Sequence, residues 1–254
     1  LCLGWISLIR PTNLIIMVVF LFWGISEGGL RLWFSGLRRH FHHLVLIGLA
    51  AGIVWLPQLG YWHYTTGAWL FWSYGGERFF FDSPEIINGL FSYRKGWLLY
   101  TPIMSFALFG ILLLRKQLRP AFLAILLFTL LNIYIVLSWW SWWYGGSFGL
   151  RAFIDSYAIL AIPMAMMLDW LRHQRTKLWK GISLGIFGLL IAHSVFQTMQ
   201  YYYGSIHWDS MTKEAYWDSF LRLRPSPVFY DLLEPPPGLD EVLEEKGTTS
   251  VQQE

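Results

Sequence analysis

Charged side chains are scarce in this sequence. Only 14% of its 254 residues are Asp, Glu, Lys or Arg, whereas 55% are hydrophobic and 19% are aromatic. A soluble domain carries roughly a quarter charged residues, because its surface has to face water. The polar residues here are too few to cover such a surface, and the apolar ones come in long uncharged runs. The composition therefore indicates that the lipid bilayer surrounds most of the chain.

Cysteine is nearly absent as well. The single residue, Cys2, excludes an intrachain disulfide and any metal site built from several cysteines. There is also no glycine-rich phosphate loop, nucleophile elbow or zinc-binding helix motif. The histidines at 40, 42 and 43 continue a basic loop, and we interpret them as part of that loop. We therefore predict no cofactor and no metal ligands, while a requirement for a divalent metal stays open.

Basic residues are not gathered as in a nucleic-acid-binding protein. The net charge of +3 and the pI of about 9.0 come from short clusters between apolar runs. A nucleic-acid-binding protein would concentrate these charges on one face or tail. We therefore exclude a nucleic-acid partner.

Six apolar segments are long enough to cross the hydrocarbon core, which takes about 20 helical residues. The first is interrupted by Arg10-Pro11, which predicts one broken helix or two short ones. Pro57 is expected to kink or end the second. The predicted spans are 1–26, 44–62, 96–114, 120–139, 152–168 and 181–200. We predict an all-α polytopic membrane protein with about six transmembrane helices and extended extracytoplasmic loops; five or seven spans also fit the pattern.

The distribution of charge predicts the orientation. Ten of the nineteen basic residues lie in the three short loops after the first, third and fifth predicted spans. The positive-inside rule places such loops in the cytoplasm. Nearly all of the acids lie in or beside segments 63–95 and 139–155 or after residue 200. We therefore predict that these segments, including the C-terminal tail, are extracytoplasmic.

Two regions are predicted along the chain. Residues 1–200 form a transmembrane helical domain, and residues 201–254 form an extracytoplasmic tail. Three tyrosines at 201–203 suit the membrane interface. After residue 235 the tail becomes acidic and polar, which predicts disorder. Because no basic stretch precedes the first apolar segment, we expect the chain to be the C-terminal part of a longer protein.

The outer segment 62–102 is longer than a connector between two helices needs to be. Arg94 and Lys95 stand just before the third span, at the height of the lipid headgroups, where they suit the phosphate of a lipid-linked donor. The alternative is that they only anchor the helix end at the interface. Three acids of the same segment are candidates for binding an acceptor or sugar: Glu77, Asp82 and Glu85.

The outer segment 138–155 combines four tryptophans with a Gly-Gly turn and an arginine. Tryptophan faces pack against the C–H faces of sugar rings, but they also line membrane interfaces, so both interpretations stay open. Arg151 and Asp155 are four residues apart on one predicted helical face. They form either a mutual ion pair or, with Arg151 facing a phosphate, part of a site. The sugar-binding candidates of this segment are Trp143, Tyr144 and Asp155.

Four stretches of the sequence resemble one known family. They are LIRPTN (8–13), PQLGYWHYTTGAW (57–69), FSYRKGWLLYTP (91–102) and WWYGGSFGLRAFID (142–155). They are similar to bacterial integral-membrane glycosyltransferases of the C-type superfamily, which includes protein-mannosyltransferase-like and dolichyl-phosphate-mannose-type enzymes. The resemblance covers most of residues 1–200, and its most specific motif is the Gly-Gly-x-x-Gly-x-Arg run.

The resemblance implies a transferase in a bacterial inner membrane. Such an enzyme moves a sugar from a polyprenyl-phosphate carrier to a glycan, lipid or protein acceptor on the outer face. Enzymes of that superfamily place an acidic catalytic base in their first outer loop, and no residue of this chain matches it. We therefore assign no catalytic residue.

Two other functions stay open. A transporter or flippase of lipid-linked sugars would also use aromatic residues and arginines, but it would need broken helices and polar residues at mid-membrane. Apart from a few residues such as Arg10 and His193, the predicted spans are apolar, which favours chemistry at the membrane surface. A non-catalytic assembly protein of the cell envelope is the third possibility, because the family's base has no match here.

Overall fold

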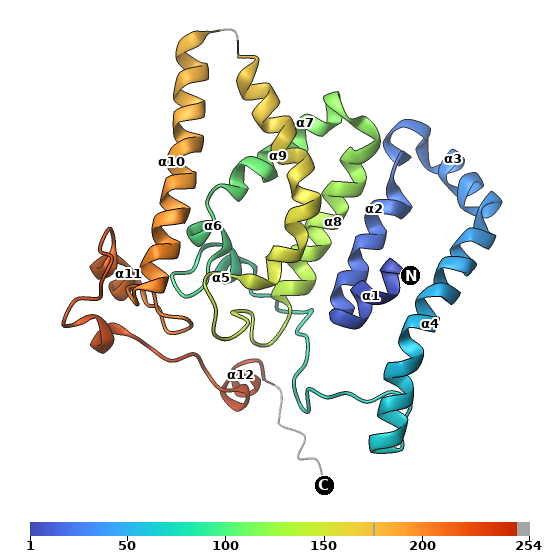
Figure 1. Ribbon diagram of the computed structural model, residues 1–254, viewed down its shortest axis with the longest axis horizontal. Coiled ribbons are helices and arrows are strands. Elements are labelled where there is room, and N and C mark those ends of the chain that lie inside the picture. The colour runs from blue at the N-terminus through green and yellow to red at the C-terminus, as the bar shows by residue number, and fades with distance from the viewer. Residues whose placement is uncertain (175, 248–254) are drawn as a thin grey trace. The chain divides into compact units, whose positions relative to one another are not determined.

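The structure is a computed structural model that describes residues 1–174 and 176–247 (Figure 1). Its regular secondary structure is helical throughout these residues, with one isolated β-bridge between Phe79 and Trp139. The chain divides into two compact units. Unit 1 comprises Leu1–Arg78 with Leu118–Asn132, and unit 2 comprises Phe79–Gln117 with Ile133–Glu254.

Four helices of the described residues are long and apolar enough to cross a membrane. They are α4 (Phe41–Thr66), α8 (Arg119–Leu137), the continuous helix Arg151–Arg172 and α10 (Lys177–Tyr202). A fifth span results if Pro11–Phe22 and Ile25–Arg39, which are bent by 93°, count as one. The chain is therefore an all-helical membrane protein with four or five candidate spans in its described part, where the sequence predicts about six.

Unit 1 contains the predicted break in the first apolar segment. Helix α1 (Cys2–Ile9) ends at Arg10, whose backbone is extended, and a 3-10 helix η1 (Pro11–Ile16) begins directly after it. The proline explains this start, because it has no N–H to donate and its fixed φ suits the first helical position. The unit continues with α2 (Met17–Phe22), α3 (Ile25–Arg39), α4 and most of α8. Helix α4 runs through Pro57 to Thr66, so this proline does not end it.

Unit 2 holds the other elements. They are α5 (Ile86–Phe91), α6 (Trp97–Tyr100), α7 (Met104–Gln117), the end of α8, η2 (Arg151–Ser156), α9 (Tyr157–Arg172), α10, α11 (Lys213–Ser219), η3 (Phe229–Leu232) and α12 (Leu239–Glu245). Helices α7 and α9 pack closely, and a Cβ added at Gly110 would lie 2.0 Å from the carbonyl oxygen of Pro163. Small residues allow such close approach between membrane helices.

The predicted third span, 96–114, has a different form in the structure. The helix breaks after Tyr100, because Thr101 leaves helical geometry ahead of Pro102. Helix α7 then begins at Met104 and contains 14 residues, which is short for a full span.

The tail belongs to unit 2 and packs on other elements of that unit. Ile206, Met211, Tyr216 and Phe229 form a buried cluster with Tyr100. The buried amide of Gln200 on α10 donates to the carbonyl oxygens of Ser219 at 2.7 Å and Arg222 at 2.9 Å. These contacts order the tail on the end of α10, as Figure 1 shows for α11.

The end of the tail also differs from the predicted disorder after residue 235. Residues 239–245 form α12, and its Val242 and Leu243 are buried against Phe80 and Trp143. The acidic residues of this helix are exposed while Val242 and Leu243 are buried, so a composition that is polar on average still contains one apolar face. Residues 248–254 lie outside the described residues.

Candidate functional site

The predicted extracytoplasmic segments that belong to unit 2, from Phe79 onward, converge at one end of that unit. The Phe80 N–H donates to the Ser138 carbonyl oxygen at 2.6 Å, and the Ser147 N–H donates to that of Trp208 at 3.2 Å. This end lies beside α5, α6 and α11 in Figure 1. Two groups of side chains gather here. One is a cationic cluster, defined by Arg94, Lys95 and Arg151, and the other is a pocket formed by tryptophans.

Lys95 is the buried member of the cationic cluster, with a relative exposure of 1%. Its ammonium donates to the carbonyl oxygen and, at 3.3 Å, to the hydroxyl of Ser147. Burial lowers the pKa of Lys95 to about 7. The carboxylate of Asp209 raises this pKa, whereas the charges of Arg151 and Arg94 lower it further. Both arginines are therefore close enough to Lys95 to affect its pKa.

Arg94 holds the tail in place. Its guanidinium donates to the carbonyl oxygens of Asp209 at 2.8 Å and Glu234 at 2.9 Å. Burial lowers the pKa of Arg94, and the carboxylates of Glu234 and Asp209 partly oppose this effect. These donors face protein carbonyl groups, which makes Arg94 a positioning residue that ties two parts of the tail to the start of α6.

Arg151 is the exposed member of the cluster and begins η2. The sequence places Arg151 and Asp155 on one α-helical face, but residues 151–156 form a 3-10 helix. With three residues per turn, side chains four residues apart point about 120° away from each other. The prediction that Arg151 and Asp155 share one α-helical face is therefore wrong for this segment, and both residues are exposed.

His207 and Asp209 join the cationic cluster from the tail. Their side chains approach to 3.2 Å between Nδ1 and Oδ1, and the His207 ring centroid lies 3.9 Å from that of Trp208. Burial lowers the pKa of His207, and the nearby Asp209 carboxylate raises it. Sequence reasoning missed His207 and Asp209, because it treated the tail as a separate region and no local motif marks them. It also missed Ser147, which occupies a variable position of the Gly-Gly-x-x-Gly-x-Arg run.

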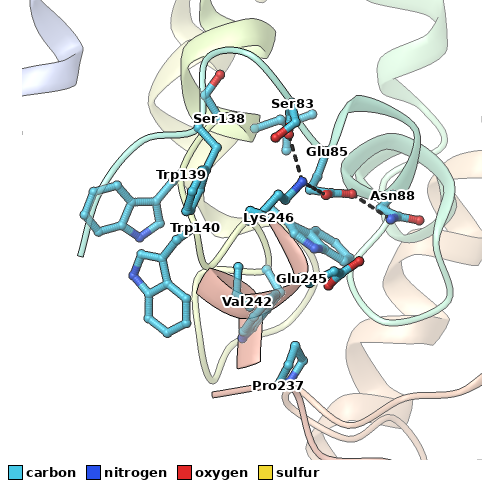
Figure 2. Close-up of a pocket in the computed structure, with 14 residues that line it drawn as sticks. Ser83, Glu85, Asn88, Ser138, Trp139, Trp140, Pro237, Val242, Glu245 and Lys246 are labelled. Carbon is cyan, nitrogen blue, oxygen red and sulfur yellow. Dashed lines mark hydrogen bonds and ion pairs between the residues drawn. The ribbon is translucent and has the colours of Figure 1, made fainter. Parts of the chain in front are cut away.

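The tryptophan pocket has a volume of about 100 Å³. The tryptophans at 139, 140, 142 and 143, which follow α8, form one part of its wall together with Phe80. Glu85 and Asn88 line another part, and Lys246 enters from the end of α12 (Figure 2). The Glu85 carboxylate lies 2.5 Å from the Lys246 ammonium and accepts from the Asn88 amide at 2.9 Å.

The predicted sugar- and acceptor-binding residues do not all meet in this pocket. Glu85 and Trp143 line it. Tyr144 donates its hydroxyl to the Val136 carbonyl oxygen at 2.8 Å, and Asp82 is exposed outside the pocket lining. Glu77 belongs to unit 1, whereas the pocket lies in unit 2. Among residues 1–174 and 176–247, no three His, Cys, Asp or Glu side chains are spaced to hold a metal ion.

The burial of Lys95 makes a prediction about stability and pH. On unfolding, its pKa returns from about 7 to about 10.5, so between these values the unfolded chain binds more protons. The free-energy cost of burying the charged Lys95 is present in full below pH 7, and it decreases as the pH rises because the ammonium loses its proton. We expect the midpoint of thermal unfolding in detergent to rise from pH 7 to pH 10, and to rise less in Lys95→Met.

The matched control is Lys213→Met, because Lys213 is exposed on α11. In this variant the midpoint of thermal unfolding should rise with pH as much as in the unchanged protein. An equal rise in Lys95→Met and in the unchanged protein would contradict the assignment of the effect to Lys95.

Comparison of the chain with models of known protein families, with curated proteins and with solved structures finds no match.

Proposed function

We propose that this chain carries the donor-phosphate-binding part of a bacterial membrane glycosyltransferase. In this proposal a polyprenyl-phosphate-linked sugar is the donor, and the transfer takes place at the extracytoplasmic face. The observation that supports it best is the gathering of Arg94, Lys95 and Arg151 at one end of unit 2. The tryptophan pocket belongs to the same unit, and its four tryptophans precede Arg151 by 8 to 12 positions in the chain.

The transfer needs charge stabilisation on the leaving group. The hydroxyl oxygen of the acceptor forms a bond to the anomeric carbon of the sugar, and the bond from that carbon to the phosphate oxygen breaks. The electron pair of the broken bond leaves with the polyprenyl phosphate, which gains one negative charge. Cations aimed at this oxygen lower the barrier, because the charge develops in the transition state. The acceptor proton passes to a base, which we assign to no residue of this chain.

Arg151 is the residue that we propose contacts the donor phosphate. Its side chain is exposed, and a guanidinium can bind two phosphate oxygens at once. Lys95 and Arg94 add positive charge behind it, and the hydrogen bonds of Lys95 to Ser147 hold this charge in place. Phosphate binding would in turn favour the protonated form of Lys95, because an anion raises the pKa of a neighbouring ammonium.

Donor turnover by the full-length protein in liposomes tests this proposal. Polyprenyl-phosphate-linked mannose is supplied together with an envelope extract as the source of acceptors, and free polyprenyl phosphate is measured by mass spectrometry. Release that depends on both the protein and the extract supports a transferase. Movement of intact donor across the membrane without release would instead indicate a flippase and would overturn the proposal.

The proposed orientation makes a separate prediction. Green fluorescent protein inserted after Lys116 should fluoresce in bacterial cells, whereas alkaline phosphatase inserted there should be inactive, because basic loops stay in the cytoplasm. The same reporters inserted after Gly204, at the start of the tail, should give the opposite pattern. Arg94 of the cationic cluster contacts the tail at Asp209, so the reporters at Gly204 give the side of this cluster. A fluorescent protein and an inactive phosphatase there would put the cluster on the cytoplasmic side and contradict the proposed face of transfer, whereas active phosphatase at Lys116 would contradict only the predicted cytoplasmic loop.

A further inference from the structure

We infer that the tryptophan pocket binds one pyranose ring, as a carbohydrate subsite distinct from the cationic cluster. Its role as the place of a sugar acceptor rests on the proposed function, whereas sugar binding itself does not. The inference depends on three features of the pocket: the arrangement of its aromatic wall, the nature of its polar groups and its volume.

The aromatic wall offers flat apolar faces at fixed angles. The Trp142 and Trp143 rings meet edge to face, with centroids 5.7 Å apart and planes at 89°. Trp140 meets Trp143 in the same way, at 5.8 Å and 79°. Trp143 is only 4% exposed and packs with Val242 and Leu243 of α12, which keeps these rings in place. Rigid aromatic faces suit the C–H face of a pyranose at little entropic cost on binding.

The polar groups lie opposite part of this wall. Figure 2 shows Lys246 between Trp139 and Trp140 on one side and Glu85 and Asn88 on the other. The Lys246 ammonium also donates to the Ser83 carbonyl oxygen at 3.0 Å. A carboxylate, an amide and an ammonium together can both accept from and donate to sugar hydroxyls. Ser83, Ser138 and Glu245 also line the pocket, so hydrogen-bonding groups are as prominent in it as the aromatic rings, which suits a polyhydroxyl ligand.

The hydrogen-bonding groups of the pocket, more than its charge, distinguish a sugar from a quaternary ammonium ligand. Aromatic cages next to a carboxylate often hold such cations. Here the carboxylate of Glu85 pairs with the Lys246 ammonium at 2.5 Å, and Glu245 adds a second carboxylate to the lining. A quaternary ammonium has no hydrogen-bond donor or acceptor, so it would leave the amide of Asn88 and the ammonium of Lys246 without a bond to the ligand. A polyhydroxyl ligand can donate to the carboxylates and accept from the amide and the ammonium.

The volume limits the ligand to a single ring. A pocket of about 100 Å³ is well below the roughly 300 Å³ at which sites for drug-sized molecules begin. It has room for several water molecules, which hydroxyl groups can replace. A whole pyranose is larger than this volume, so we expect the pocket to receive one edge of a single ring while the rest of that ring, and any further sugar unit, lies outside it.

Saturation-transfer NMR on the detergent-solubilised full-length protein tests this inference, with methyl α-D-mannopyranoside as the probe. No donor is present, so binding is measured apart from turnover. We expect saturable transfer that is strongest to the ring C–H protons and is not displaced by choline. In Trp140→Leu the affinity should fall about five- to tenfold, which is the usual scale of a lost aromatic contact. The matched control Trp72→Leu, at an exposed site of unit 1, should bind as the unchanged protein does.

A second pair of variants keeps the test decisive if Trp140→Leu does not fold. Glu85→Gln keeps the size of the side chain but removes the carboxylate, and it should also lower the affinity for the mannoside probe. Glu244→Gln changes an exposed residue of α12 outside the pocket, and it should leave this affinity unchanged.

Three results would overturn the inference: absent or unsaturable transfer, displacement of the probe by choline, or folded Trp140→Leu and Glu85→Gln variants that bind the probe as tightly as the unchanged protein. Sugar binding without donor turnover would refute the proposed transferase alone, and turnover without sugar binding would refute only the subsite.

Discussion

The Arg151→Ala variant of the full-length protein is expected to lose sugar transfer by about 100- to 1,000-fold, the usual effect of removing one group that stabilises developing charge. Arg151 is the exposed cation of the cluster and the one that we propose contacts the donor phosphate. Polyprenyl phosphate released in the liposome assay measures the loss. Arg151→Lys should retain part of the activity, because an ammonium keeps the charge but cannot bind two phosphate oxygens in the same fork.

The matched control for this prediction is Arg224→Ala, which removes an exposed arginine of the tail. It should leave turnover unchanged. Membrane insertion and the elution profile in detergent should be the same for all three variants, because Arg151 is not part of the buried core. Full turnover in Arg151→Ala would remove this residue from the site.

A substitution between two helices is expected to have the largest effect on stability. In Gly110→Ala, the added Cβ would lie 2.0 Å from the carbonyl oxygen of Pro163 and 2.7 Å from its carbonyl carbon. These atoms belong to the backbone of α9, so the two helices have to move apart. Overpacking of this kind costs about 1–3 kcal/mol and sometimes more. Thermal unfolding in detergent, or unfolding by increasing SDS, measures the loss.

Gly185→Ala in α10 is the matched control, because a Cβ added there meets no atom within 4 Å. Alanine favours a helix over glycine by about 0.5–1 kcal/mol, so this variant should be as stable as the unchanged protein or slightly more so. Equal stability of Gly110→Ala and Gly185→Ala would show that α7 and α9 are not packed as closely as the structure has them.

The sequence predicts where most of the long helices lie, but it predicts less well where they begin and end. Four of the six predicted spans are helices long enough to cross a membrane, because uncharged runs of this length are a direct signal of helix in lipid. The break at Arg10-Pro11 is also local and was predictable. The interruption before Pro102 was missed, because the apolar run 96–114 continues across it and hydropathy does not record backbone geometry.

The candidate site was predictable only as a set of segments. The residues Arg94, Lys95 and Arg151 were named from their charge and position, yet the sequence does not distinguish the buried Lys95 from the exposed Arg151. It also gives no sign that Arg94 binds carbonyl groups as far away as Glu234, 140 positions along the chain. The pocket residue Lys246 lies in a stretch whose average composition predicts disorder.

Composition and hydropathy by themselves determined that this chain is an all-helical membrane protein, and they placed its cationic and tryptophan-rich segments between the helices. The physical reason is that the bilayer acts on each segment separately, according to its own transfer free energy. Only the tertiary structure decided that the tail packs on the end of α10, that Lys95 is buried against Ser147, and that Lys246 meets Glu85 beside the tryptophans. These contacts join residues distant in sequence, and they depend on shape and hydrogen-bonding geometry that no local pattern records.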